Sequence, residues 1–257
     1  MKKIIALLLV VMIAFSFAAC GKKDDAADTP STDGAKKYII ATDTTFAPFE
    51  YQDENGEYVG IDIELLAAIA EDQGFEYELQ PLGFDAACAA LESGQADGVI
   101  AGMSIKEDRK LKYDFSDPYF DSAVVMAAKA GSDYKTLDDL KGQTIAVKTG
   151  TEGASYAESV KDEYQLELKY FEESPYMYQE VTTGNAAACV EDYEIMRFGI
   201  ENGNGLEMVG EKQVASQYGF AVKKGQNAEL LEMFNAGLKN ITESGKYDEI
   251  LAKYLSK

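Results

Sequence analysis

The feature that most constrains the fold is an alternation of strand-like and helix-like segments, which starts near residue 38. Short apolar or alternating segments are typical of strands, and segments with apolar residues on one face are typical of helices. Strands are expected at 38–42, 75–79 and 98–101, and helices at 62–73 and 85–92. Gly74 and Gly94 follow the two helices and are expected to end them. Strand, helix, strand in repetition predicts an α/β sheet with parallel members.

The same alternation restarts near residue 123. Further strands are expected at 123–128, 144–148, 166–171, 187–190 and 218–222. Further helices are expected at 136–142, from 154 onward, and at 176–183, 193–200, 227–242 and 246–254. Two sheets built in turn without a long linker predict two lobes that face a cleft. In open α/β sheets a ligand lies beyond the carboxyl ends of the strands, so the residues that follow each strand are the candidates for binding.

The first 37 residues predict export and attachment to a membrane. Lys2 and Lys3 precede an apolar run at 4–19, and the small residues Ala18 and Ala19 precede Cys20, as in a lipoprotein signal. We therefore expect a signal peptide at 1–19, with Cys20 as the lipidated first residue of the mature protein. An uncleaved signal anchor is the alternative. Residues 20–37 contain no large apolar side chain and are expected to form a disordered linker.

Composition excludes several classes of function. The chain contains no histidine, which removes histidine general bases, catalytic triads with histidine and histidine-ligated zinc. A net charge of −21 argues against a nucleic-acid partner. Cys88 and Cys189 lie in apolar runs, so two small hydrophobic side chains are favoured over a disulfide. No metal and no cofactor are expected.

Charged and polar residues follow the predicted strands in both halves. Asp43 follows the first strand, and Gly102, Ser104 and Arg109 follow the third. Ser104 and Glu107 have the spacing of a capping box, which predicts a helix start beside the Arg109 guanidinium, a good receptor for a small carboxylate.

In the second half, the loop with Thr151 leads into a helix and offers backbone donors, and Asp192 follows a strand. An ammonium acceptor opposite a carboxylate receptor fits a free α-amino acid. Each residue also has a purely structural interpretation, as a surface charge (Arg109), an ordinary turn (the Thr151 loop) or a helix cap (Asp43 and Asp192). Taken singly, phenylalanines such as Phe46 and Phe84 belong more often to the hydrophobic core than to the wall of a ligand site.

Taken together and in this order, these segments resemble the polar-amino-acid solute-binding proteins of ABC importers. The resemblance is carried by ATDTTFAPFEY at 41–51, GIDIEL at 60–65, GMSIKEDR at 102–109, DFSDPY at 114–119 and IAVKTGT at 145–151. It covers essentially all of residues 38–257. It implies a two-lobed type II periplasmic-binding-protein fold with two hinge crossovers and a ligand cleft between the lobes. Lobe 1 would comprise 38–122 plus 217–257 and lobe 2 would comprise 123–216, with crossovers near 120–123 and 216–219.

The resemblance also implies a role for each site residue. Arg109 would bind the ligand α-carboxylate with help from Gly102, Ser104 and the backbone around Thr151. Asp192 would take the α-ammonium, and Phe46 and Phe84 would enclose the aliphatic part of the ligand. Asp43 and Lys148 would meet the ligand side chain, and this pair of an acceptor and a cationic donor matches a carboxamide. Lys148 also argues against lysine or arginine as the ligand.

The segment around Asp192 departs from the family pattern. Glu191 replaces the histidine found in glutamine binders of this type, and 185–192 lacks the usual arginine and aspartate. The pair Asp43 and Lys148 makes glutamine the leading expectation, whereas the Glu191 difference argues against it and leaves another polar amino acid such as glutamate as the alternative. A dehydratase or a sensor module of the same fold is a further alternative, but an enzyme is not expected.

The expected partners are a free L-amino acid, an ABC permease in the cytoplasmic membrane and the membrane itself through the N-terminal lipid. The protein is expected to be extracytoplasmic, lipid-anchored and monomeric.

Overall fold

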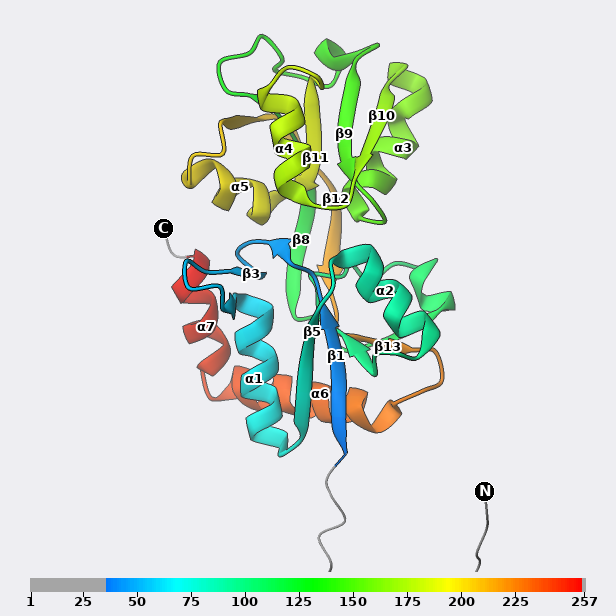
Figure 1. The fold of residues 1–257 in the computed structure, drawn as a ribbon, viewed down its shortest axis with the longest axis vertical. Coiled ribbons are helices and arrows are strands. Elements are labelled where there is room, and N and C mark those ends of the chain that lie inside the picture. The colour runs from blue at the N-terminus through cyan, green and yellow to red at the C-terminus, as the bar shows by residue number, and fades with distance from the viewer. Residues whose placement is uncertain (1–35, 256–257) are drawn as a thin grey trace, which may run out of the picture. The chain divides into compact units, whose positions relative to one another are not determined.

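Two five-stranded mixed sheets form the frame of the computed structural model, which describes residues 36–255 (Figure 1). The first sheet has the order β5-β1-β6-β13-β7, with bounds Glu76–Pro81, Lys37–Thr42, Gly98–Val99, Ala221–Lys223 and Tyr113–Phe115. The second has the order β10-β9-β11-β8-β12, with bounds Glu167–Phe171, Thr144–Lys148, Ala188–Asp192, Phe120–Lys129 and Leu206–Tyr218. A small antiparallel sheet of β2 (Thr45–Phe46), β3 (Glu50–Gln52) and β4 (Tyr58–Val59) adjoins the first. The predicted signal peptide, Cys20 and most of the linker lie outside the described residues.

Parallel pairing occurs on one side of each sheet, from an edge strand to the central strand, as the alternation of strands and helices predicts. β1 pairs in parallel with β5 and β6, and β9 pairs in parallel with β10 and β11. β13 and β8 run antiparallel to their neighbours because the chain passes directly between the sheets there, without a helical crossover. We call the first sheet with the small sheet and its helices the first lobe, and the second sheet with its helices the second lobe.

Seven α-helices lie within the described residues. The first lobe holds α1 (Ile61–Gln73), α2 (Phe84–Ser93), α6 (Ala228–Glu243) and α7 (Lys246–Leu255), and the second holds α3 (Glu152–Tyr164), α4 (Ser174–Thr182) and α5 (Tyr193–Glu201). The predicted stops are confirmed, since Gly74 and Gly94 have φ values of +71° and +77° and cap α1 and α2. The left-handed region is accessible to glycine without the steric cost that other residues meet there.

Each central strand buries alternate side chains on opposite faces of its sheet. In the first lobe, Ile40 and Ile100 join the core that contains α1 and α6, and Ala41 and Val99 join the core that contains α2. The second lobe repeats this arrangement. Residues of α3 share a core with Val124 and Met126 of β8, and residues of α4 share one with Val125 and Ala127. Strands buried on both faces read as continuous apolar runs, which is why the sequence predicts them well.

Two long strands connect the lobes. β8 and β12 pair antiparallel from Lys129↔Leu206 to Phe120↔Tyr218, and Figure 1 shows both running between the two sheets. The predicted crossovers, near 120–123 and 216–219, fall at the first-lobe ends of these strands. The exact lobe boundaries remain a prediction.

Three local predictions are wrong. No α-helix begins at Ser104, since its backbone bridges to Tyr218, the N–H of Ile105 donates to the carbonyl of Gln217 (2.8 Å), and a single 3₁₀ turn follows at Arg109–Leu111. The helix expected at 136–142 shortens to the 3₁₀ turn Asp138–Leu140, because the Asp139 carboxylate accepts from the N–H groups of Lys135 and Thr136 and holds a local turn instead. The sequence also failed to predict the strand β12, whose exposed polar residues do not alternate with apolar ones.

Two further observations concern the cysteines and the helices. Cys88 and Cys189 are both free thiols, as predicted for small hydrophobic side chains that form no disulfide. Burial raises the pKa of the Cys88 thiol to about 11. Within residues 36–255, no helix has the length and apolar character needed to cross a membrane.

Candidate functional site

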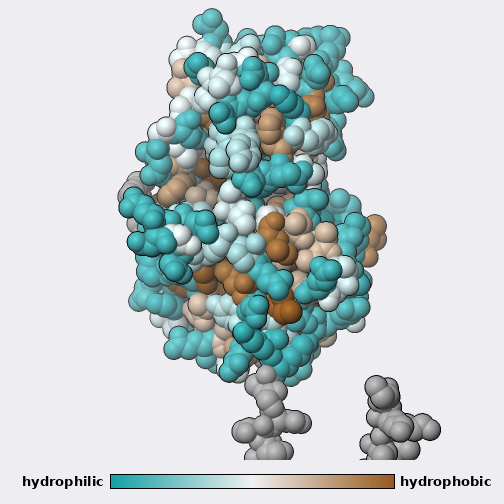
Figure 2. All heavy atoms as spheres, viewed as in Figure 1, coloured by the Kyte–Doolittle hydropathy of each residue, from teal (hydrophilic) through white to brown (hydrophobic). Residues whose placement is uncertain are grey.

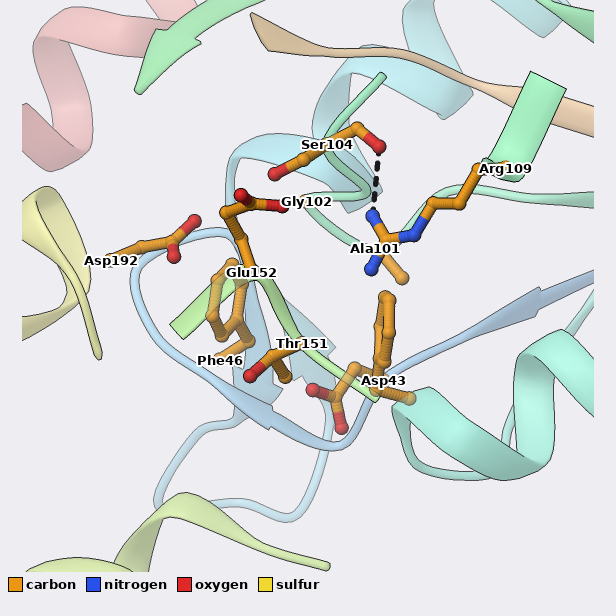
Figure 3. A pocket seen from close by; sticks show the side chains of 10 residues that line it. Asp43, Phe46, Ala101, Gly102, Ser104, Arg109, Thr151, Glu152 and Asp192 are labelled. Atoms are coloured by element: carbon orange, nitrogen blue, oxygen red, sulfur yellow. Dashed lines mark hydrogen bonds between the residues drawn. The ribbon is translucent and has the colours of Figure 1, made fainter. Parts of the chain in front are cut away.

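The predicted binding residues meet in a pocket between the two lobes (Figure 3). It is lined by Asp43, Phe46, Phe84, Ala101, Gly102, Ser104, Arg109, Thr151, Glu152 and Asp192. All of the predicted site residues except Lys148 are among them, and Ala101 and Glu152 were not predicted. Asp43 follows β1, Gly102 follows β6, Thr151 follows β9 and Asp192 ends β11. The pocket therefore lies at the carboxyl ends of parallel strands from both sheets, where the sheet rule places a ligand.

Arg109 connects the two lobes at one side of the pocket. Its Nη1 donates to the carbonyl of Ser104 (2.8 Å) and its Nη2 to the carbonyl of Gly150 in the second lobe (2.9 Å). The guanidinium carbon lies 5.2 Å from the centre of the Phe84 ring. A guanidinium has five N–H donors in a fixed plane. The two bonds and the ring orient this plane at the pocket wall, where further donors can bind a carboxylate.

Gly102 is required by its backbone conformation and by the neighbouring Phe46. Its φ is +51°, and a Cβ there would lie 2.3 Å from Cε1 of Phe46. The N–H of Gly102 donates to the buried carboxylate of Asp62 at 2.8 Å, and the Tyr119 hydroxyl donates to the same oxygen at 2.8 Å. Burial raises the pKa of Asp62 to about 6. Asp62 therefore fixes the loop that carries Gly102 and Ser104 from behind the pocket.

A second buried acid lies close to Asp62. Glu50 is fully buried, and both of its carboxyl oxygens lack a hydrogen-bond partner within the described residues. Burial, followed by the charge of Asp62, raises the pKa of Glu50 well above its usual value. A protonated Glu50 beside an ionised Asp62 is the arrangement that these two environments favour. The sequence predicts neither acid as a ligand-binding residue, because Glu50 begins a strand and Asp62 lies at a helix start, where polar residues are common.

Asp43 and Lys148 form a buried ion pair between the lobes. The side chains are 2% and 1% exposed, and Lys148 Nζ donates to Asp43 Oδ2. Lys148 does not line the pocket; it lies behind Asp43 and 5.6 Å from the centre of the Phe46 ring. That both groups meet the ligand side chain stays a prediction; in this structure the two charges pair with each other.

Asp192 presents a carboxylate from the second lobe. It accepts hydrogen bonds from the hydroxyls of Tyr218 and, at 3.4 Å, Ser122, which belong to the two connecting strands. Burial and then the neighbouring charge of Glu191 raise the pKa of Asp192 to about 7. A ligand ammonium would stabilise the ionised form and reverse much of this shift.

The Glu191 side chain is held away from the pocket. Its Oε2 accepts from the hydroxyls of Ser174 and Tyr178, both at 2.9 Å, and its Oε1 accepts from the N–H of Asp192 at 3.1 Å. Glu191 is not among the lining residues. Its effect on the pocket therefore acts through Asp192, by charge and by the shared backbone contact, rather than by touching a ligand.

Thr151 and Glu152 start α3 at the pocket edge. The Thr151 hydroxyl caps the helix by accepting from the N–H of Ala154 at 3.2 Å, as expected from the loop that leads into a helix. Glu152 follows at the first helical position, and its Oε2 lies 3.0 Å from Nζ of Lys106 in the first lobe. The sequence gives no local signal for this contact, because the two residues meet only when the lobes are packed together.

The lobes enclose little space in this conformation. The pocket holds a volume of about 10 Å³, room for about one water molecule. An amino acid can enter only if the lobes move apart or the lining side chains change rotamer.

A larger cavity of about 420 Å³ lies on the other side of β2, but no charged side chain lines it. The charged pocket is therefore the better candidate for a zwitterion. No cluster of three or more potential metal ligands occurs within residues 36–255.

Comparisons with known proteins identify the family. The family described as bacterial extracellular solute-binding proteins, family 3, matches residues 38–257. A probable histidine-binding protein of Neisseria gonorrhoeae is 34% identical, over 100% of this chain and 97% of its own length. The arginine-binding extracellular protein ArtP of Bacillus subtilis is 30% identical, over 100% and 99%. The structure of an ancestral arginine-binding protein bound to glutamine is 38% identical with a TM-score of 0.80, over 86% and 98% of the two chains.

Proposed function

The chain belongs to the bacterial extracellular solute-binding proteins of family 3, which are amino-acid-binding components of ABC transporters, and we propose that it captures glutamine. It is a binding protein rather than an enzyme. The observation that carries the proposal is the placement of Arg109 and Asp192 at opposite sides of one pocket, each on a different lobe. Only closed lobes can offer both charges to the carboxylate and the ammonium of one amino acid.

The remaining charges favour an uncharged ligand side chain. Asp43 and Lys148 neutralise each other next to Phe46. A carboxamide can donate to Asp43 and accept from Lys148 without changing the net charge, whereas a guanidinium or ammonium would compete with Lys148 for Asp43. The alternative ligands are glutamate and the cationic amino acids, since two of the relatives carry histidine- and arginine-binding names.

Binding would proceed by hinge closure about β8 and β12. The enclosed volume of about 10 Å³ is too small for an amino acid, and opening of the lobes would provide the space for a ligand to enter. The ligand then stabilises the closed form because only that form satisfies both of its charges. Glutamine has ten non-hydrogen atoms, so a micromolar affinity of about −8 kcal/mol needs only ~0.8 kcal/mol per atom, below the ceiling of ~1.5 for very small ligands.

Calorimetric titration of the twenty common amino acids tests the proposal. The protein is first unfolded and refolded to remove any ligand that co-purifies. Tight binding of glutamine supports the proposal, and tight binding of another amino acid keeps the transport role but changes the ligand. No binding across the panel would overturn the amino-acid function.

Arg109→Ala should weaken binding by several kcal/mol, because it leaves a ligand carboxylate unpaired in a closed pocket. A loss of less than about threefold in affinity would contradict the pocket assignment.

We further propose that the protein is monomeric, attached to the membrane through a lipid on Cys20, and that an ABC permease in the cytoplasmic membrane recognises its closed form. Lobe 1 would comprise 38–122 plus 217–257 and lobe 2 would comprise 123–216. Mass spectrometry of the mature N-terminus tests the anchor, since Cys20→Ala should abolish a diacylglyceryl adduct and release the protein from membranes. A Cys20→Ala variant that stays with the membrane would contradict the lipid anchor.

A further inference from the structure

A cationic side chain from the first lobe pairs with an acid in the pocket wall of the second lobe. Lys106 Nζ lies 3.0 Å from Glu152 Oε2 and donates to the Ser155 hydroxyl at 2.8 Å. Lys106 follows Ser104 by two residues, so it extends from the same loop that supplies the carboxylate-binding side of the pocket. Glu152 and Ser155 both belong to the first turn of α3.

Glu152 faces the space that a ligand would occupy. Its side chain is 9% exposed, against 20% for Lys106, and it lines the pocket together with Asp192. In the view of Figure 3, Glu152 lies between Asp192 and Ser104. Its charge also helps to raise the pKa of Asp192, after burial and Glu191. Glu152 is therefore close enough to influence the charge of whatever binds there.

The charges of the pocket wall balance only when Lys106 is included. Asp43 is paired with Lys148, and Glu152 is paired with Lys106. Arg109 and Asp192 then remain as one positive and one negative group, which together complement a zwitterion with an uncharged side chain. Without Lys106 the wall carries one additional negative charge. In a closed site, an unmatched charge next to a ligand has a large effect on which ligands bind.

We propose that Lys106 is a specificity-determining residue, whose ammonium neutralises Glu152 in the closed pocket and so favours uncharged amino-acid side chains over cationic ones. This inference rests on the proposed amino-acid function. Lys106 does not touch the ligand in this role; it acts through Glu152. Glu152 is the first residue of α3, so its side chain lies at the positive end of the helix dipole, on the pocket side of its contact with Lys106.

The test measures ligand preference rather than affinity alone. Glutamine, arginine and glutamate are titrated into wild type, Lys106→Met, Glu152→Gln, the double variant and the conservative variant Lys106→Arg. The preference is the dissociation constant of arginine divided by that of glutamine. In Lys106→Met it should fall at least tenfold, which corresponds to ~1.4 kcal/mol. In Glu152→Gln, the dissociation constant of glutamate relative to glutamine should fall instead, because Lys106 is then an unpaired cation.

The double variant and Lys106→Arg serve as the decisive controls. The double variant removes both charges, so its preference should return to within about threefold of wild type, and Lys106→Arg should leave the preference unchanged. Thermal unfolding of each variant confirms that it is folded.

If Lys106→Met weakens all three ligands by the same factor, Lys106 only supports closure and the inference is wrong. A wild type that binds arginine more tightly than glutamine would overturn the inference while keeping the amino-acid function. A wild type that binds no amino acid would remove both.

Discussion

Besides the lysine-paired acids Asp43 and Glu152, each lobe buries two further carboxyl groups next to the pocket, and these two pairs are held in different ways. In the first lobe, Asp62 accepts from the Gly102 N–H and the Tyr119 hydroxyl, while Glu50 has no hydrogen-bond partner for its carboxyl oxygens within residues 36–255. In the second lobe, Glu191 is bound by two hydroxyls, and Asp192 lines the pocket.

Burial raises the pKa of all four acids, so a raised pKa alone does not distinguish a binding residue from a supporting one. The direction in which the carboxylate points does distinguish them. We therefore expect the first-lobe pair to act on stability and Asp192 to act on binding.

The largest expected effect is on binding in the second lobe. Asp192→Asn should weaken amino-acid binding at least 100-fold, since the ligand ammonium loses its charged partner in a closed site, a loss of about 3 kcal/mol. The urea concentration at the unfolding midpoint of Asp192→Asn should differ little from that of wild type. Titration calorimetry and urea unfolding measure the two quantities. The matched control is Asp133→Asn in the same lobe, outside the pocket, which should alter neither. A folded Asp192→Asn variant with wild-type affinity would remove the basis of the comparison.

The opposite pattern is expected in the first lobe. Asp62→Ala should lower the free energy of unfolding by about 2 kcal/mol, because it leaves the Gly102 N–H and the Tyr119 hydroxyl without an acceptor. Urea unfolding measures this, and Glu71→Ala, at an exposed position of the same helix, is the control. Ligand affinity should fall by a smaller amount than in Asp192→Asn. If Asp62→Ala keeps its stability but loses binding, the assignment of roles to the two pairs is reversed.

The pH dependence of binding sharpens the comparison further. The pKa of Asp192 is raised to about 7, so its carboxyl group is largely protonated at pH 6 and largely ionised at pH 8. A ligand ammonium prefers the ionised form, so affinity should increase by up to about tenfold from pH 6 to pH 8, with proton release on binding. Titrations in buffers of different ionisation enthalpy measure the released proton. Asp192→Asn should show no such release, and proton uptake in the wild type would contradict the prediction.

The smallest effect is expected for Glu50→Gln. Because the folded-state pKa of Glu50 is raised above 4.5, its contribution to stability is complete at low pH and is lost as the pH rises through the folded value. Glutamine cannot ionise, so the variant should lose less stability between pH 5 and pH 8, a difference of about 1 kcal/mol. Urea unfolding at several pH values measures it, with Glu54→Gln in the exposed turn of the same hairpin as the control. Parallel pH profiles for wild type and Glu50→Gln would show that this acid is not buried as described.

Local patterns in the sequence predict most of the frame. The apolar face of α1 and the glycine that ends it depend only on neighbouring residues, and the central strands are apolar because both of their faces are covered. Because ligands of α/β sheets lie beyond the strand ends, the sequence also predicted that Asp43, Arg109 and Asp192 would be near one another, and all three line one pocket.

What the sequence could not predict depends on contacts between distant segments. Ser104 was expected to start a helix, but it bridges to Tyr218, which lies more than a hundred residues away. Lys106 and Glu152 meet only across the lobes, and Lys148 turns toward Asp43 rather than into the pocket. The Glu191 side chain points away from the pocket because two hydroxyls on α4 donate to its carboxylate. These features depend on how the lobes pack together, which local sequence patterns do not indicate.

The connection through β8 and β12 has a practical consequence for measuring closure by fluorescence. The first and last elements of the described region, β1 and α7, both belong to the first lobe, where Tyr254 and Lys253 of α7 bind Glu64 of α1. Two fluorophores placed beside β1 and α7 would therefore keep a constant separation and give no energy-transfer signal on ligand binding. A dye on the exposed Tyr176 position of α4, paired with one at Glu71 of α1, would span the moving parts and turn the protein into an amino-acid sensor.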